Sequence, residues 1–156
     1  MDTLINPQGQ VHLGVLPTSP LHINHLDFDL RNNMDKAITG FRKKMRFNQF
    51  QFIGLSGDDF ILGVAIVNLK WVSNCFLYIY QPSTQTFKEF SWLKPFALNT
   101  KTDTQPNNGH WSFRSGHNHI EIISQNHKRQ LKIECGNALN VNVTIENDDN
   151  SELLIN

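Results

Sequence analysis

The amino-acid sequence predicts an all-β protein: an antiparallel β-meander that forms an up-and-down barrel or half of one, preceded by an extended N-terminal arm. Apolar residues alternate with a period of two between residues 49 and 81, which is the period of a β-strand. Turn-forming residues recur roughly every ten residues after residue 46, a spacing typical of sandwiches and barrels that leaves no room for crossover helices. The 156 residues fit one domain that can bury a core without disulfides.

The N-terminal arm comprises residues 1–45 and carries turn signals rather than strand periodicity. Asn6-Pro7 and Gln8-Gly9 are turn dipeptides, and a tight turn is expected at Gln8-Gly9. Residues 33–45 contain apolar side chains at helical spacing, but Gly40 weakens a helix there. We therefore predict an extended arm with at most one short turn of helix.

The segment from residue 49 to residue 81 is apolar on both faces of its predicted strands. A strand with one face in water would carry polar residues at every second position. We therefore expect these strands to be covered on both sides, as in a closed or strongly curved sheet filled from within. One alternating set comprises Phe50, Phe52, Phe60, Leu62, Val64 and Ile66, and the intervening set comprises Ile53, Leu55, Ile61, Ala65, Val67 and Leu69.

Residues 46–156 form the meander, in the same single domain as the arm. Residues 128–147 alternate polar and apolar side chains, which indicates strands with one wet face. The polar loop at residues 99–109 interrupts the regular spacing of the predicted strands and is expected to be a lid or a mobile loop. The apolar residues 153–155 would need a partner strand. Strands are expected at residues 46–55, 59–69, 72–82, 85–93, 110–116, 118–125, 128–136 and 138–147.

Charge and cysteine content narrow the class of protein. The chain has 14 basic and 14 acidic residues. Because nucleic-acid-binding domains tend to be clearly basic, we expect no nucleic-acid partner, despite the basic run at residues 42–46. A net charge near zero also favours self-association. Cys75 and Cys135 lie in predicted strands and are expected to be buried, reduced thiols. Residues 1–10 lack the features of a signal peptide, and no window approaches the ~18 apolar residues of a membrane span. We therefore expect a cytoplasmic protein with no membrane span.

The sequence offers few groups for catalysis or cofactor binding. His117 and His119 are two residues apart on a predicted strand that continues to Glu121, and His110 begins the same hairpin. Such a pair is a weak metal signal and is better explained by polar side chains on the solvated face of a strand. Neither a phosphate-binding glycine loop nor a nucleophile elbow is present. We predict no metal and no other cofactor, and we assign no catalytic residue.

Large side chains of the central strands are the candidate ligand-binding residues. A solid core is the default for such a set, and the alternative is the lining of a cavity for an apolar molecule. Gly54, Gly63 and Ala65 favour the cavity, because they remove side-chain volume from a sheet that otherwise carries large residues. The candidates are Phe50, Phe52, Phe60, Asn68, Trp71, Tyr78 and Tyr80.

Three segments resemble the bacterial family known as domain of unknown function 2804. Residues 4–20 resemble its N-terminal turn, residues 42–52 and 59–68 its central motif, and Phe76-Leu77-Tyr78-Ile79-Tyr80 its apolar strand. That family is similar to two-domain lipocalin-like proteins, whose relatives include carotenoid hydratase-like proteins. The resemblance implies a lipocalin-like (calycin) barrel or half-barrel and a lipid-like ligand. It supplies no catalytic residues, since the family has no established activity.

The chain departs from the family pattern in charge and in length. Family members tend to have Lys where this chain has Asn48 and Asp where it has Asn68. If that pair is a buried ion pair, two amides replace it without leaving an orphan charge; if it is catalytic, this chain has lost it. The family is also longer, and the chain resembles its N-terminal half only. The resemblance therefore leaves two alternatives: the chain is a truncated relative, or a homodimer or a second-half partner chain completes it.

Three functions follow as hypotheses. The preferred one is a lipocalin-like domain that binds an apolar or lipid-like small molecule. The second is a hydratase, cyclase or isomerase acting on an apolar substrate, which needs a polar group in a dry cavity; the candidates are Asn68, His117, His119 and Glu121. The third is a non-catalytic, truncated family member that acts as an interaction module through an exposed strand edge.

Overall fold

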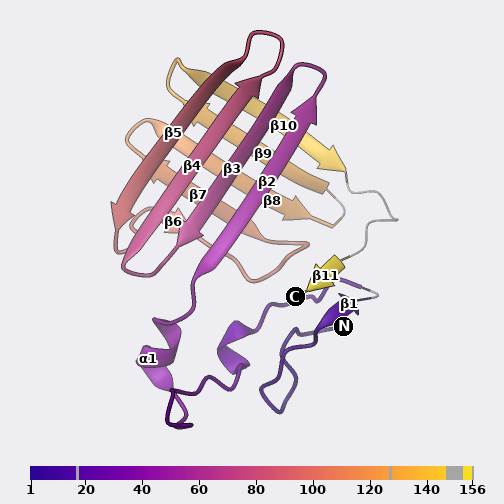
Figure 1. Ribbon diagram of the computed structural model, residues 1–156, viewed down its shortest axis with the longest axis vertical. Coiled ribbons are helices and arrows are strands. Elements are labelled where there is room, and N and C mark those ends of the chain that lie inside the picture. Colours follow the sequence, from indigo (N-terminus) through magenta and orange to yellow (C-terminus); the bar gives the residue numbers. More distant parts are fainter. Residues whose placement is uncertain (17, 127, 147–152, 156) are drawn as a thin grey trace.

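The computed structural model describes residues 1–16, 18–126, 128–146 and 153–155, and its main part is two layers of antiparallel β-sheet (Figure 1). The strands of the two layers run in crossing directions in that view. The front layer has the order β2-β3-β4-β5: β2 (Gln49–Gly57), β3 (Phe60–Asn68), β4 (Val72–Gln81) and β5 (Thr86–Pro95). The rear layer has the order β10-β9-β8-β7-β6: β6 (Thr100–Lys101), β7 (His110–Ser115), β8 (Asn118–Gln125), β9 (Lys128–Cys135) and β10 (Leu139–Glu146).

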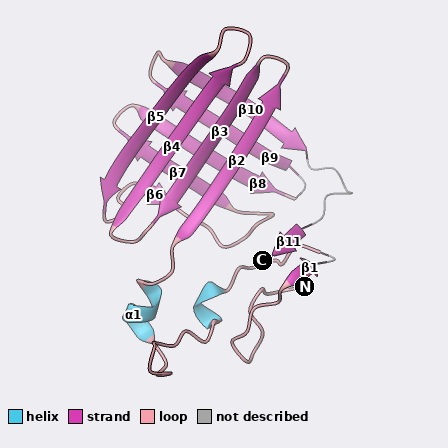
Figure 2. Ribbon diagram, in the orientation of Figure 1, coloured by secondary structure: helices cyan, strands magenta, loops and turns pink. Residues whose placement is uncertain are grey.

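Helix is nearly absent from the described part of the chain (Figure 2). The arm contains α1 (Gly40–Lys44) and one turn of 3-10 helix, η1 (His25–Asp27). Within the described ranges, no helix is long and apolar enough to cross a membrane. A third, two-stranded sheet pairs β1 (Gly14–Leu16) with β11 (Leu153–Ile155) in antiparallel register, so the strand-like residues near the C-terminus find their partner in the arm.

The all-β, antiparallel prediction is confirmed, but the described strands do not close into a barrel. Each strand expected between residues 46 and 147 is present within a few residues of its expected ends. The chain changes sheet between β5 and β6, where Phe96, Ala97 and Asn99 have φ angles of 53°, 52° and 57°. Left-handed backbone at three of four residues ends the ladder of β5. The next strand, β6, pairs with β7 instead, so two separate sheets face each other.

The hydrophobic core fills the space between the two layers. Buried positions alternate along β4, β8 and β9, as expected where one face of each strand is turned inward. In β3 the five consecutive residues 62–66 are buried. This burial is the main stabilising contribution to the sandwich. The cluster consists of Ile53, Leu62, Val64, Ile66, Cys75, Leu77, Trp111, Phe113, Ile120, Ile122, Leu131, Ile133 and Cys135.

The two cysteines are free and buried in opposite layers, Cys75 in β4 and Cys135 in β9. Burial, with a smaller contribution from Cys135, raises the pKa of Cys75 to about 12. Burial also raises the pKa of Cys135. Because the thiolate is the reactive form, we expect neither thiol to react with an aromatic disulfide reagent in the native protein at mildly alkaline pH. Both should react in concentrated guanidinium chloride, and rapid labelling of the native protein would contradict the burial.

The outer faces of the two layers differ in chemistry. The rear layer turns polar residues such as Glu121 and Lys132 outward, as the alternation predicts. The front layer leaves large apolar side chains exposed, including Phe50 (58%) and Leu93 (67%). The expectation that the central strands are covered on both sides is therefore wrong for the described chain. A two-layer sandwich has a single interior, so one of the two apolar sets remains at the surface.

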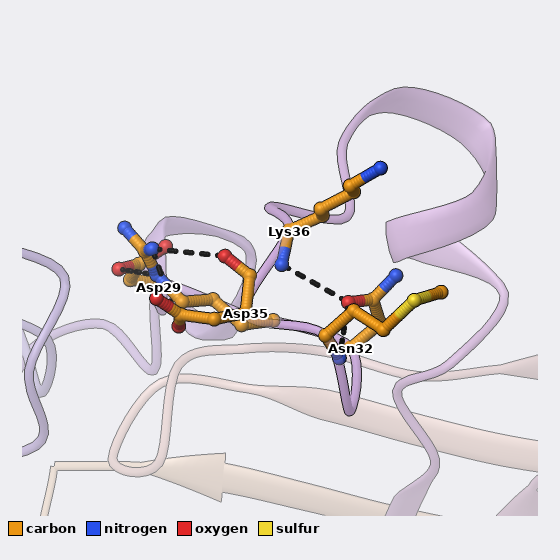
Figure 3. A network of polar contacts seen from close by, with 6 residues as sticks. Asp29, Asn32, Asp35 and Lys36 are labelled. Carbon is orange, nitrogen blue, oxygen red and sulfur yellow. Dashed lines mark hydrogen bonds and ion pairs between the residues drawn. The ribbon is translucent and has the colours of Figure 1, made fainter.

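Short polar contacts shape the arm. The turn expected at Gln8-Gly9 is present, with Gly9 at a φ of 78°. The carbonyl of Gly9 accepts a hydrogen bond of 2.9 Å from the backbone N–H of Asp29. Arg31 Nε lies 2.8 Å from Asp29 Oδ2, and Asn32 Oδ1 accepts a 3.0 Å bond from the N–H of Lys36. Figure 3 shows the contact between Asn32 and Lys36 beside Asp29 and Asp35. These local bonds hold the arm in shape although much of its apolar surface is exposed.

Candidate functional site

A cavity opens between the two layers at the end where the β2–β3, β4–β5 and β9–β10 turns lie. Its volume is about 470 Å³, within the roughly 300–1,000 Å³ usual for small-molecule sites. Both layers contribute to it, the front layer through β3, β4 and β5 and the rear layer through β10 and the turn before it. The lining residues are Asp59, Phe60, Ile79, Gln81, Thr86, Lys88, Phe90, Ala138 and Leu139.

The inner walls of the cavity are apolar because strand alternation turns these positions inward. Ile79, Phe90 and Leu139 line the cavity and also pack against the buried core cluster. Phe60 is 42% exposed and lies so close to Gly57 that a Cβ there would contact the ring. The cavity is thus a continuation of the core that is left open at one end.

A hydrogen-bonded carboxylate holds one side of the mouth. Asp59 Oδ2 accepts bonds from Ser83 Oγ (2.6 Å) and Gln81 Nε2 (2.8 Å), and Asp59 Oδ1 accepts one from the Ser83 N–H (2.9 Å). The three hydrogen bonds lower the pKa of Asp59. The bond from the Ser83 side chain has the largest effect, and those from the Gln81 side chain and the Ser83 backbone have smaller effects. Asp59 therefore fixes the β4–β5 turn against the start of β3, and its lone pairs are largely used within the protein.

A lysine and a threonine occupy the β5 side of the mouth. Lys88 stands opposite Ile79 in the register of β4 and β5, on the side of the sheet that faces the cavity. Its ammonium group forms no ion pair with any described residue. Thr86 Oγ1 accepts a 2.9 Å bond from Thr84 and retains its own proton for a further partner. The mouth thus offers one cation and one hydroxyl above an apolar interior.

The structure separates the large residues that the sequence analysis grouped as ligand-binding candidates. Phe60 lines the cavity. Trp71 lies in the β3–β4 turn with its ring 6.3 Å from that of Phe96, and Asn68 Oδ1 accepts a 2.8 Å bond from the Lys70 N–H. Alternation along the strands places the remaining four on the outer face of the front layer: Phe50, Phe52, Tyr78 and Tyr80.

The histidine and carboxylate candidates lie apart from the cavity, on or beside the rear layer. Glu121 Oε1 lies 2.7 Å from His110 Nε2, and Glu121 Oε2 lies 3.8 Å from Lys132 Nζ. His119 shares that outer face with Glu121, while His117 is exposed in the β7–β8 turn. Within the described ranges no three metal-ligating side chains converge. Asn68 and these residues therefore do not supply a polar group to the cavity.

Sequence reasoning missed most of the cavity-lining residues. Lys88, Phe90 and Trp92 occupy alternate positions of β5, so a lysine next to two aromatic residues on one face of a predicted strand was the available signal. Leu139 is the first residue of β10, a strand that was expected to have one face in water. The alternation of apolar residues along this strand does not indicate that a cavity opens at its first residue. The cavity depends on where two separate sheets diverge, which strand periodicity does not specify.

Comparison with known proteins identifies a family but no characterised relative. The family described as Domain of unknown function (DUF2804) matches residues 3–156. No curated protein and no solved structure matches the chain. Because the family match extends over the arm and both layers of the sandwich, the chain belongs to the DUF2804 family.

Proposed function

We propose that this protein binds an elongated, mainly apolar small molecule with an anionic head group in the cavity between its two layers. The observation that carries the proposal is a cavity of about 470 Å³ whose interior is apolar and whose mouth holds a lysine. Sites for small molecules are commonly apolar clefts with a few polar groups that fix orientation. The apolar part of the ligand would displace water from Ile79, Phe90 and Leu139, and this burial provides the affinity.

The charges at the mouth favour an anionic rather than a cationic head group. Lys88 has no ion-pair partner among the described residues, so its ammonium can bind a carboxylate. Asp59 already accepts three hydrogen bonds from Gln81 and Ser83, which stabilise its charge without a ligand cation. The Thr86 hydroxyl can donate to the same head group as Lys88.

The proposed site works as a lipocalin-like cavity does, with an apolar interior reached from an open end. In this chain the interior would be enclosed by two facing sheets instead of one closed barrel. The proposal makes the protein a binding module and assigns no reaction to it.

Titration with a fluorescent polyene fatty acid tests the proposal. We expect saturable binding at one site per chain with a dissociation constant in the micromolar range. Leu139→Trp should abolish binding, because the indole would fill the cavity. Lys88→Gln should weaken fatty-acid binding by about fivefold to tenfold, as expected for loss of a charge-assisted bond at a partly wet site, and should leave the affinity for the corresponding alcohol unchanged.

Lys36→Gln is the matched control for the charge change. It also removes one exposed cation, but in the arm and away from the residues of the cavity. We expect Lys36→Gln to bind the fatty acid as the unaltered protein does. Absence of saturable binding, or equal weakening by Lys36→Gln and Lys88→Gln, would refute the proposed site.

A further inference from the structure

The outer face of the front layer is a broad apolar surface, which we call the front face. It consists of the outward positions of β2, β3, β4 and β5, and in Figure 1 no other element crosses it. Among its outward side chains the only charged one is that of Glu89. Monomeric proteins rarely expose an apolar patch of this extent. Its main exposed members are Phe50, Phe52, Ile61, Phe87 and Leu93.

Two aromatic rings of the front face, those of Phe52 and Tyr78, lie beside glycines of the sheet. A Cβ at Gly63 would contact the ring of Tyr78, and one at Gly54 would lie 3.3 Å from the ring of Phe52. The rings of Phe50 and Phe52 are within 2° of parallel, with centroids 6.4 Å apart. The two glycines thus provide room for rings to lie over the backbone. An apolar sheet surface is suited to packing face to face on a second sheet.

We propose that the front face is an interface between two copies of this chain, packed front face to front face about a two-fold axis parallel to the strands. This proposal is independent of the ligand site, which lies on the inner side of the same sheet. The two-fold arrangement places β5 of one copy over β2 of the other. The two Glu89 carboxylates then lie at opposite margins of the interface, and neither is buried against the other.

The size of the front face supports a second copy as its occupant. Four strands at a spacing of about 4.8 Å, each about nine residues long at about 3.3 Å per residue, cover about 600 Å². Two such faces bury about 1,200 Å², which reaches the range of specific interfaces. The chain also has equal numbers of basic and acidic residues, 14 of each, so two copies do not repel each other through net charge.

Analytical ultracentrifugation of the full chain over a range of concentrations tests this interface. We expect a species of twice the 18.0 kDa of one chain at tens of micromolar. Phe76→Lys, near the centre of the face, and Leu93→Lys, at a position that is 67% exposed, should each weaken dimerisation at least about tenfold. Leu93→Lys keeps the test valid if Phe76→Lys impairs folding, because a residue this exposed contributes little to the monomer.

Thr144→Lys is the matched control, since it adds the same charge to an exposed outer position of β10 in the rear layer. We expect it to remain dimeric and to keep its circular dichroism spectrum. A monomer at every concentration would overturn the proposal, as would equal dissociation by Thr144→Lys and Leu93→Lys. Fatty-acid binding by Leu93→Lys should be retained, so failure of one proposal is distinguishable from failure of the other.

Discussion

Phe113→Ala is expected to lower the free energy of unfolding by about 3–5 kcal/mol, the usual cost of truncating a fully buried phenylalanine. Phe113 lies in β7, is 0% exposed and belongs to the cluster that joins the two layers. It stands beside Ile120 of β8 and Thr100 of β6 in the sheet register. The cavity left by the ring would therefore open next to the corner at which the chain changes sheet. For a chain of this length the loss corresponds to a fall in melting temperature of roughly 6–20 °C.

Phe41→Ala is the matched control, because Phe41 is 70% exposed in α1. Exposed substitutions usually change stability by about 0.5 kcal/mol or less. Urea denaturation followed by tryptophan fluorescence measures both variants. One protein concentration is used throughout, because the proposed dimerisation would make stability concentration-dependent. Similar losses for Phe113→Ala and Phe41→Ala would mean that the core does not lie between the layers as described.

Strand periodicity was sufficient to locate the strands of the two large sheets but not to assemble them. Alternating apolar residues between turns identify β2, β3 and β4, because the side chains of a strand point alternately to its two faces. The same rule predicted the wet outer face of β9 and β10. Periodicity does not show whether neighbouring hairpins continue one sheet or begin another. The change of sheet occurs where Phe96, Ala97 and Asn99 have left-handed backbone. None of these residues is glycine, so the sequence did not predict the change of sheet at this point.

The doubly apolar strands did not indicate which of the ligand-binding candidates line the cavity between the layers. Phe50, Phe52, Tyr78 and Tyr80 were grouped with Phe60 as ligand-binding candidates, yet only Phe60 lines the cavity between the layers. An apolar residue at an outward position looks the same in a sequence whether it lines a ligand cavity or meets another chain. The second apolar set lies on the exposed front face and does not line a second interior. Under the proposed dimer, the outward apolar set would mark an interface, which strand periodicity in one chain cannot distinguish from a core.

The loop at residues 102–109, between β6 and β7, is expected to behave as a structural connection and not as a mobile lid. Asp103 Oδ1 accepts bonds from the N–H groups of Thr104 (2.7 Å) and Gln105 (3.1 Å), and Oδ2 accepts one from His110 (3.1 Å). Burial alone would raise the pKa of Asp103, but these bonds, with the charge of Lys101, lower it on balance. Ionised Asp103 therefore stabilises the folded loop at pH values above the ordinary carboxyl pKa. This stabilisation is lost as the pH falls through the lowered pKa of Asp103.

Gly109→Ala is expected to disrupt this loop and to release the N-terminal arm. A Cβ at Gly109 would contact the backbone oxygen of Gln105 and lie 3.3 Å from the Cβ of Asp103. Backbone atoms cannot turn aside as a side chain can, so overpacking of about 1–3 kcal/mol is expected. The arm is joined to this loop by a 2.8 Å bond from the Ile23 N–H to the Thr104 carbonyl. Amide hydrogen exchange should therefore accelerate at Ile23, and limited proteolysis should cut the arm sooner.

Gly136→Asn is the matched control for this glycine substitution. Gly136 lies in the β9–β10 turn at a φ of 54°, and a Cβ there has no atom within 4 Å. Asparagine tolerates left-handed backbone, so hydrogen exchange at Ile23 should stay unchanged in this variant. Unaltered exchange at Ile23 in Gly109→Ala would show that the arm is held to the sandwich by contacts other than this loop. Accelerated exchange confined to Gly109→Ala would identify the predicted lid as the element that fixes the arm.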